Sequence, residues 1–252
     1  MMRALFYKEL KEHVLSRKGL LIYFALSILL SAMAFSFVTF KELSLLAQVE
    51  VNMTFIKILL GVGILISIII GSTMISNEKE QGTLESLLLT PLSNLKIIMV
   101  KAATICVFWF GVVIISIPYF FALTYGTQLL PTVIALILIL GTLLVFGFSL
   151  FSLAFSTWFS STKNATLLSI VLFVITLLPM FLSTKMKKAG FAYVLDRTSP
   201  ISSTLLTAKD LLINKLGMST ILLDILPVFI FFIIAIIILL FASRYIKLMG
   251  GE

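Results

Sequence analysis

The sequence predicts an all-α integral membrane protein with six transmembrane helices, and three observations lead to that prediction. Of its 252 residues, 60% are hydrophobic and only 12% are charged, whereas a soluble domain usually has about 25% charged residues. The mean hydropathy is +1.19. Five stretches without Asp, Glu, Lys or Arg are long enough to cross a bilayer, which takes about 20 apolar residues. The chain therefore has too few charges to cover a soluble fold.

Four of these stretches fit one helix each, and the longest, residues 102–162, fits two. Its middle reads Tyr125-Gly126-Thr127-Gln128 and then Pro131, which is typical of a turn followed by a helix start. We therefore expect a single transmembrane domain over residues 1–252, with spans at about 20–40, 58–76, 102–124, 132–157, 164–184 and 225–243.

The first span is expected to be a retained anchor and not a cleaved signal peptide. Ala32-Met33-Ala34 resembles a cleavage site, but Glu9 and Glu12 precede the span and its apolar run continues to Phe40. The apolar region of a signal peptide is shorter than this.

Residues 2–18 predict an amphipathic helix lying at the membrane interface. One side of the helical wheel is apolar and the other is basic. The apolar side consists of Met2, Leu5, Phe6, Leu10 and Val14. The basic side consists of Lys8, Lys11 and Lys18. Glu9 and His13, one turn apart, fall inside the apolar stripe. They predict a local pair facing a neighbouring polar group, with proton sensing as the alternative.

Basic residues predict that both chain ends lie in the cytoplasm, at the plasma membrane. The N-terminal segment holds five of them, whereas the next loop has only Lys41 and Lys57. Such an excess marks the cytoplasmic side, and six spans return the C-terminus to that side. Three lysines next to a span end on the opposite side do not fit this orientation; they are Lys185, Lys187 and Lys188.

The loop 76–101 predicts a short amphipathic helix over residues 78–89. Leu84, Leu87 and Leu88 form a helical stripe, and Glu78, Glu80 and Glu85 supply its polar side. Thr90-Pro91 is expected to end this helix and Ser93 to cap the next one. The helix either rests on lipid headgroups or acts as a lever that docks into a groove of a partner.

The pattern Glu-x-x-x-Gly-Thr-Leu-Glu-x-Leu-Leu-x-Thr-Pro at residues 78–91 resembles the signature that follows the second span in ABC-2-type permeases. These are the membrane subunits of type-2 ABC exporters. The resemblance implies that 78–89 is the cytoplasmic coupling helix, which contacts the nucleotide-binding subunit. By resemblance, the contact residues are Glu80, Gly82, Thr83, Leu84, Glu85, Leu87 and Leu88.

The same resemblance implies the partners. A separate ATP-binding-cassette ATPase would bind ATP and Mg, and a second permease chain would complete a homodimer or heterodimer.

The outer loop fits the family pattern as well: it contains Ser199-Pro200, and Ser202 or Ser203 is expected to cap a segment that ends at Gly217. Its apolar positions are Leu205, Leu206, Leu212, Ile213 and Leu216. This segment is either a re-entrant or interfacial helix or a solvated connector.

The sequence predicts no catalytic, cofactor-binding or metal-binding residue in this chain. Cys106 and His13 are the only residues of their kinds, too few for a disulfide or a usual metal site. There is no Gly-x-x-x-x-Gly-Lys-[Ser/Thr] phosphate loop. The net charge of +8 is expected from residues flanking the spans and not from nucleic-acid binding.

We therefore expect a permease that moves a hydrophobic or amphipathic substrate out of the cytoplasm. The charge-free stretches hold no ionisable residue that could drive transport by protons. One alternative is an accessory subunit that transmits force without carrying a substrate, and another is a motor-free membrane binding or immunity protein. The substrate-binding residues are not predicted.

Small residues cluster on the fourth span and allow close helix approach. They predict packing within the chain's own bundle, with a dimer interface as the alternative. They are Gly141, Gly147, Ser149, Ser152, Ala154 and Ser156.

Overall fold

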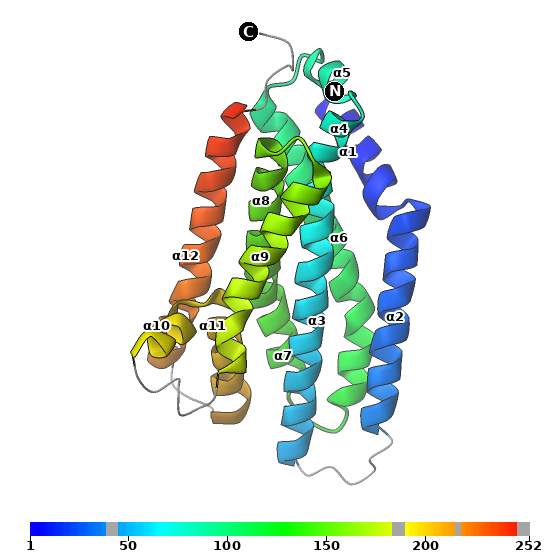
Figure 1. Ribbon diagram of the computed structural model, residues 1–252. Coiled ribbons are helices and arrows are strands. Elements are labelled where there is room, and N and C mark those ends of the chain that lie inside the picture. Colours follow the sequence, from blue (N-terminus) through cyan, green and yellow to red (C-terminus); the bar gives the residue numbers. More distant parts are fainter. Residues whose placement is uncertain (39–44, 183–189, 215–217, 246–252) are drawn as a thin grey trace.

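Six long helices stand side by side in one bundle (Figure 1). A computed structural model describes residues 1–38, 45–182, 190–214 and 218–245. Six of its helices are long and apolar enough to cross a membrane, which confirms the predicted fold class and number of spans. The spans are formed by α2 (Arg17–Val38), α3 (Leu45–Thr73), α6 (Asn94–Leu123), α7 (Leu130–Leu136) continued through the π-helical η2 (Ile137–Gly141) into α8 (Thr142–Trp158), α9 (Thr162–Phe181) and α12 (Met218–Ala242).

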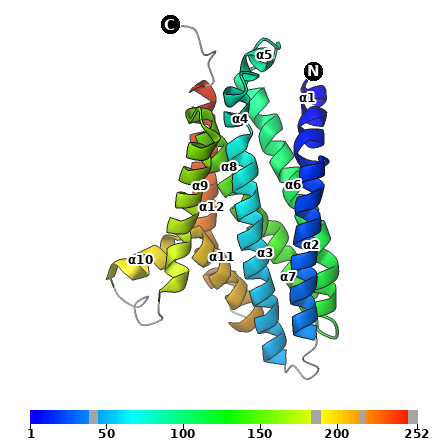
Figure 2. The same cartoon turned by 45° about the vertical axis from the view of Figure 1, so that its right-hand side comes forward.

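Short helices gather at the two ends of the bundle (Figures 1 and 2). At the end that carries the N-terminus lie α1, α4 and α5, and at the other end lie α10 and α11. Their bounds, with those of the turns that extend them, are α1 (Met2–Glu9), η1 (Leu10–Val14), α4 (Ser76–Glu80), α5 (Leu84–Leu88), α10 (Gly190–Thr198), α11 (Pro200–Lys209), η4 (Asp210–Asn214) and η5 (Ser243–Tyr245). The last turn, η5, is at the same end as α1, as an even number of spans requires.

The spans differ in how deeply they are buried. The hydrophobic stretches of α3, α6 and α8 are more than half buried inside the chain, whereas those of α2, α9 and α12 are mostly exposed. α3 packs on α6, α8 and α9, while α12 packs on α8 and α2 on α6. A helix that is apolar all round can lie either in a protein core or against lipid. The buried spans and the exposed spans can therefore have similar sequences.

The small residues of the fourth span pack inside this chain, which confirms that prediction. A Cβ added at Gly147 would lie 2.9 Å from the ring of Phe231 on α12. On α3, a Cβ added at Gly71 would lie only 3.0 Å from Cβ of Ser152. The six small residues are all buried. Their role is therefore to bring α8 close to α3 and α12.

The turn predicted within residues 102–162 is present. α6 ends at Leu123, and Gly126 has a φ of +79°, a left-handed conformation that glycine adopts readily. Pro131 lies in the first turn of α7, where its missing N–H is not needed.

α3 begins at Leu45, well before the predicted start of its span at 58. The additional turns contain polar residues such as Gln48 and Glu50. A helix satisfies its own backbone hydrogen bonds, so it can continue past the hydrocarbon into the interface. The absence of charges therefore predicts the membrane-crossing part of a helix and not its full length.

The outer segment differs from the prediction in its cap. Ser199, and not Ser202 or Ser203, caps α11: its Oγ accepts a hydrogen bond from the N–H of Ser202 at 3.3 Å. Pro200 then occupies the first turn, where its fixed φ favours the helix. α11 packs against α12, α9 and α3, so it is not a solvated connector. The predicted Leu216 and Gly217, like the three lysines at 185–188, lie outside the described residues.

Candidate functional site

The segment after α3 is the candidate site, and it contains two short helices in place of the single helix predicted over 78–89. Gly82 divides them with a φ of +68°. The N–H of Gly82 donates to the carbonyl of Lys79 at 3.1 Å, and the N–H of Thr83 donates to that of Glu78 at 2.9 Å. These two bonds form a Schellman motif, which ends a helix at a left-handed glycine. The continuous helix was therefore a wrong prediction, because the glycine of the motif is a helix end.

The second short helix, α5, turns its apolar side toward its own chain. Leu84 and Leu87 are buried in the hydrophobic core, and Leu88 is half-buried. Glu85 and Ser86 are exposed, and Leu89, just past the helix, is 80% exposed. Two of the seven predicted contact residues are thus covered almost entirely by their own chain in this structure. A contact of the remaining residues with an ATPase stays a prediction.

A groove of about 460 Å³ lies between α5 and α1. Leu5 and Lys8 line it from α1, and Ser86 and Leu87 line it from α5. Its volume is within the range of about 300–1,000 Å³ that is usual for binding pockets. The exposed residues of α5 therefore lie beside an opening that can admit side chains of another protein.

The end of α5 follows the sequence pattern. α5 ends at Leu88, just before Thr90-Pro91, as predicted. Ser93 has the extended backbone of an N-cap residue (φ −70°, ψ 150°) before α6 begins, although its side chain makes no capping hydrogen bond.

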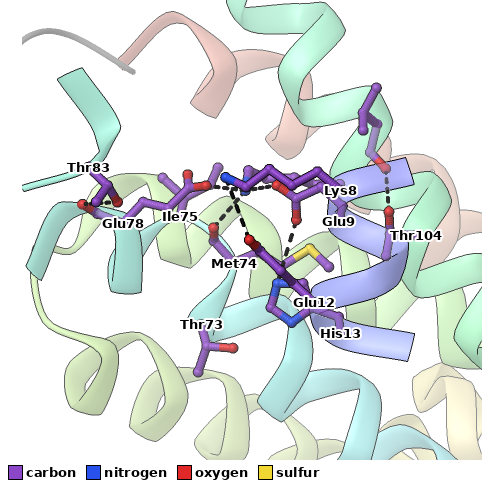
Figure 3. A network of polar contacts seen from close by, with 12 residues as sticks. Lys8, Glu9, Glu12, His13, Thr73, Met74, Ile75, Glu78, Thr83 and Thr104 are labelled. Atoms are coloured by element: carbon purple, nitrogen blue, oxygen red, sulfur yellow. Dashed lines mark hydrogen bonds and ion pairs between the residues drawn. The ribbon is translucent and has the colours of Figure 1, made fainter. Parts of the chain in front are cut away.

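A buried ion cluster joins the base of this segment to the N-terminal helix. The Nζ of Lys101, on α6, lies 2.8 Å from Oε1 of Glu9 and 2.9 Å from Oε1 of Glu78. It also donates to the carbonyl of Met74 at 2.9 Å. Figure 3 shows Glu9 and Glu78 reaching toward each other from α1 and α4. One ammonium thus satisfies groups from three parts of the chain.

The cluster is almost closed to solvent. The side chains of Lys101 and Glu9 are each 1% exposed, and that of Glu78 is 15% exposed. A buried charge is stable only when it is paired and hydrogen-bonded. The second carboxylate oxygens of Glu9 and Glu78 have no hydrogen-bond partner among the described residues. Two carboxylates therefore share one ammonium.

His13 is the fourth member of this group. Its Nε2 lies 3.5 Å from Oε2 of Glu9, one helical turn away. This confirms the predicted pair facing a polar group, and that polar group is Lys101. Burial lowers the pKa of His13 below its ordinary value of 6.5, although the carboxylate of Glu9 opposes this shift. Proton sensing by the pair stays a prediction.

The start of α4 is fixed to the end of α8. The hydroxyl of Ser156 accepts two backbone hydrogen bonds, from the N–H of Ile75 at 2.9 Å and from that of Ser76 at 2.8 Å. The first N–H groups of a helix have no partner within the helix. Ser156, on α8, supplies that partner, so the start of α4 cannot shift without breaking these bonds.

Two side chains of α4 bind the connection between α8 and α9. The ammonium of Lys79 donates to the carbonyls of Thr157 and Phe159. Glu80 accepts hydrogen bonds from the N–H of Thr162 at 2.7 Å and from its hydroxyl. Carboxylates are favourable at a helix N-terminus, which is where Thr162 begins α9. Glu80, one of the predicted contact residues, is thus engaged within its own chain.

Lys101 is a site residue that the sequence patterns do not identify. It lies directly before the charge-free stretch 102–162, where a basic residue is typical of the end of a span. The available signal was Glu9, an acidic residue inside an apolar stripe, because such a residue requires a buried partner. That signal predicts a partner but not which lysine or arginine it is.

The comparison with protein families agrees with this architecture. The family model described as "ABC-2 family transporter protein" matches residues 3–246. The comparison with curated proteins gave no match.

Proposed function

The chain belongs to the ABC-2 family of transporter proteins, and from this premise we propose that it exports a hydrophobic or amphipathic substrate from the cytoplasm. Membership makes it a multi-pass membrane permease subunit of an ABC transporter, whose ATPase activity is in a separate subunit. The direction of transport and the class of substrate are the proposal. They are supported by the lack of Asp, Glu, Lys, Arg and His in its charge-free stretches, which suits an apolar cargo moved by energy from outside the chain.

The observation that carries the proposal is the contrast between an exposed tip and a firmly bound base. Glu85, Ser86 and Leu89 are exposed on and beside α5. α4, directly before it, is bound to α6 through Lys101 and to α8 through Ser156. A push on α5 is therefore passed through α4 to several spans and not absorbed by a loose loop.

In the proposed mechanism, the ATPase binds the exposed face of α5 and the adjoining groove. Closure of two ATPase subunits on ATP displaces α5 and α4. A ligand or partner shifts a conformational equilibrium only by its differential affinity for the two states. The ATP-bound form must therefore fit α5 better in the outward-facing bundle than in the inward-facing one.

The proposed assembly contains two permease chains and two ATPase subunits. ATP and Mg belong to the ATPase, since this chain has no phosphate loop. Both chain ends lie in the cytoplasm of a plasma-membrane protein. This orientation is supported by the excess of basic residues in the N-terminal segment.

Copurification of the ATPase tests the proposal. The full-length permease is expressed with its ATPase, solubilised and purified, and the ATPase recovered is measured. Glu85→Lys with Leu89→Glu is expected to lower recovery at least tenfold, because it reverses the charge and removes the apolar character of the exposed face. The matched control is Glu50→Lys with Tyr125→Glu, two exposed residues at the other end of the bundle, and it should leave recovery unchanged.

Normal recovery with the α5 variant would contradict the proposed contact. A second readout separates a permease from an accessory subunit. Stimulation of ATP hydrolysis by a candidate apolar substrate in the wild-type complex, lost in the α5 variant, is expected only if substrate binding and the ATPase are coupled through this chain.

A further inference from the structure

A second cavity lies at the end of the bundle opposite α5, between α3, α9, α10 and α11. Its volume is about 240 Å³. Lys57 lines it from α3, and Ser202 and Lys209 line it from α11. Its apolar wall includes Met53 and Leu205. The cavity thus combines positive charge, a hydroxyl and an apolar surface within one small volume.

The two lysines give this cavity its charge. In the described part of the chain, neither Lys57 nor Lys209 has a carboxylate oxygen within 4.0 Å. Asp196 also lines the cavity, so its lining contains two lysines and one aspartate. The remaining positive charge favours an anion, and hydrogen bonds from ammonium to an anionic oxygen are stronger than neutral ones.

Ser202 provides a polar group without a partner. The residue is only 5% exposed, and its Oγ has no hydrogen-bond partner among the described residues. Its backbone N–H is already occupied by the cap residue Ser199. Buried polar groups in native proteins are nearly always hydrogen-bonded. The hydroxyl of Ser202 is therefore a donor available to a bound ligand.

An apolar crevice continues from the cavity into the bundle. It shares Lys57 and Leu205 with the cavity, and Gly61 and Phe173 line its deeper part. The crevice is narrow, at about 30 Å³. A Cβ added at Gly61 would have no neighbouring atom within 4 Å, so the space beside this glycine is open. The site is thus polar at its mouth and apolar inside.

The depth of Lys57 in the membrane agrees with this polarity. It lies nineteen residues before Ser76, or about 29 Å along a helix that rises about 1.5 Å per residue. The hydrocarbon core of a bilayer is about 30 Å thick. Since Ser76 begins the cytoplasmic segment in the proposed orientation, Lys57 lies at the outer interface. Gly61, one turn further along α3, lies within the hydrocarbon.

We propose that this cavity binds an anionic amphipathic molecule with the chemistry of an anionic phospholipid. Lys57, Lys209 and the hydroxyl of Ser202 hold its anionic head, and the start of its alkyl chain lies against Met53 and Leu205, at the mouth of the crevice beside Gly61. This site goes beyond the proposed export function, because its binding is measured on the permease alone, without the ATPase. Its failure would leave the proposed export function intact.

Native mass spectrometry of the purified chain in detergent tests this proposal with dioleoylphosphatidylglycerol as the probe. Dioleoylphosphatidylcholine and inorganic phosphate are compared with it. We expect saturable binding of one phosphatidylglycerol, at least tenfold tighter than that of phosphatidylcholine, and no measurable binding of phosphate. Equal binding of the two lipids would overturn the anionic head, and equal binding of phosphate would overturn the alkyl chain.

Variants locate the binding. Lys57→Gln with Lys209→Gln should weaken phosphatidylglycerol binding at least tenfold. The control, Lys96→Gln with Lys163→Gln, changes two exposed lysines at the other end of the bundle and should leave binding unchanged. Equal effects of both pairs would show a general attraction of lysines to anionic lipid and overturn the site.

Two smaller changes examine the hydroxyl and the crevice. Ser202→Ala should weaken binding about threefold or more without altering the charge. Gly61→Leu fills the crevice, so it should weaken binding of the dioleoyl lipid while leaving both lysines in place. If the double glutamine variant does not fold, Lys57→Arg with Lys209→Arg keeps both charges and should keep binding. Loss of binding in this folded arginine variant, or unchanged binding in both smaller variants, would contradict the proposed contacts.

Discussion

The ammonium of Lys101 lies 2.8 Å from the carboxylate of Glu9, although 92 residues separate the two in the chain. Glu9 belongs to α1 and Lys101 to α6, the third span. The same ammonium pairs with Glu78 on α4, at the start of the segment that joins α3 to α6. Because an unpaired charge is costly in a buried site, these three elements are expected to move together and not past one another.

Lys101→Met is expected to destabilise the protein strongly. It leaves the carboxylates of Glu9 and Glu78 without their cation, and breaking a buried ion pair in this way costs roughly 3–5 kcal/mol. Thermal unfolding in detergent measures the effect. Lys96→Met, at an exposed position on the same helix, is the control and should change little. Adding Glu9→Gln and Glu78→Gln to Lys101→Met should recover part of the loss, and no recovery would show that charge pairing is not the cause.

The sequence was sufficient for the number of spans and for their order. Charge-free length alone identified five stretches, and Gly126 with Pro131 divided the longest of them correctly. These signals are local: bilayer thickness determines the length of an apolar run, and glycine and proline determine the turn. The start of α3 at Leu45 was not predictable in this way, because helix beyond the hydrocarbon needs no apolar pattern.

The candidate site was predicted only in outline. A short amphipathic helix between the second and third spans followed from the sequence, but the burial of Leu84 and Leu87 did not. An amphipathic stripe shows that one face is apolar without showing whether it meets the same chain or a partner. The pairing of Lys101 with Glu9 was likewise hidden, because it joins distant segments whose meeting depends on how the helices pack.

Leu87 and Leu89 should differ in what their truncation changes. Leu87 is 9% exposed in its own chain, so Leu87→Ala should lower stability by about 2 kcal/mol, the lower end for a buried leucine. Since only its edge lines the groove, it should lower ATPase recovery per folded permease much less than Leu89→Ala does. Leu89 is 80% exposed, so Leu89→Ala should leave stability unchanged. It should reduce recovery about tenfold if the ATPase buries this side chain, because full burial of a leucine contributes about 1.5–3 kcal/mol.

The reverse outcome, with recovery lost in Leu87→Ala and kept in Leu89→Ala, would mean that α5 turns over when it binds its partner. Unfolding midpoints and copurified ATPase, measured on the same preparations, distinguish the two outcomes.

Thiol labelling in intact cells should establish the orientation. After Cys106 is replaced, a cysteine at Ser86 or Ser160 should be protected from an impermeant thiol reagent, and one at Gln128 should react. All three positions are exposed, so protection reflects the membrane and not burial in the protein. Lysed cells provide the control, in which each cysteine should be labelled. Reaction at Ser86 from outside would reverse the orientation and remove the coupling role of α5.

His13 should make the stability of the protein sensitive to acid. Burial lowers its pKa below 6.5 in the folded protein, so the unfolded chain takes up a proton at a higher pH than the folded one. The contribution of His13 to the free energy of unfolding is therefore complete above about pH 6.5. This contribution is lost as the pH falls through that value toward the lowered pKa. His13→Gln stays neutral, so its unfolding temperature should fall less than that of the wild type between about pH 7.5 and about pH 5. The opposite sign, with the variant more sensitive to acid, would mean that attraction to Glu9 outweighs burial and that protonated His13 stabilises the cluster.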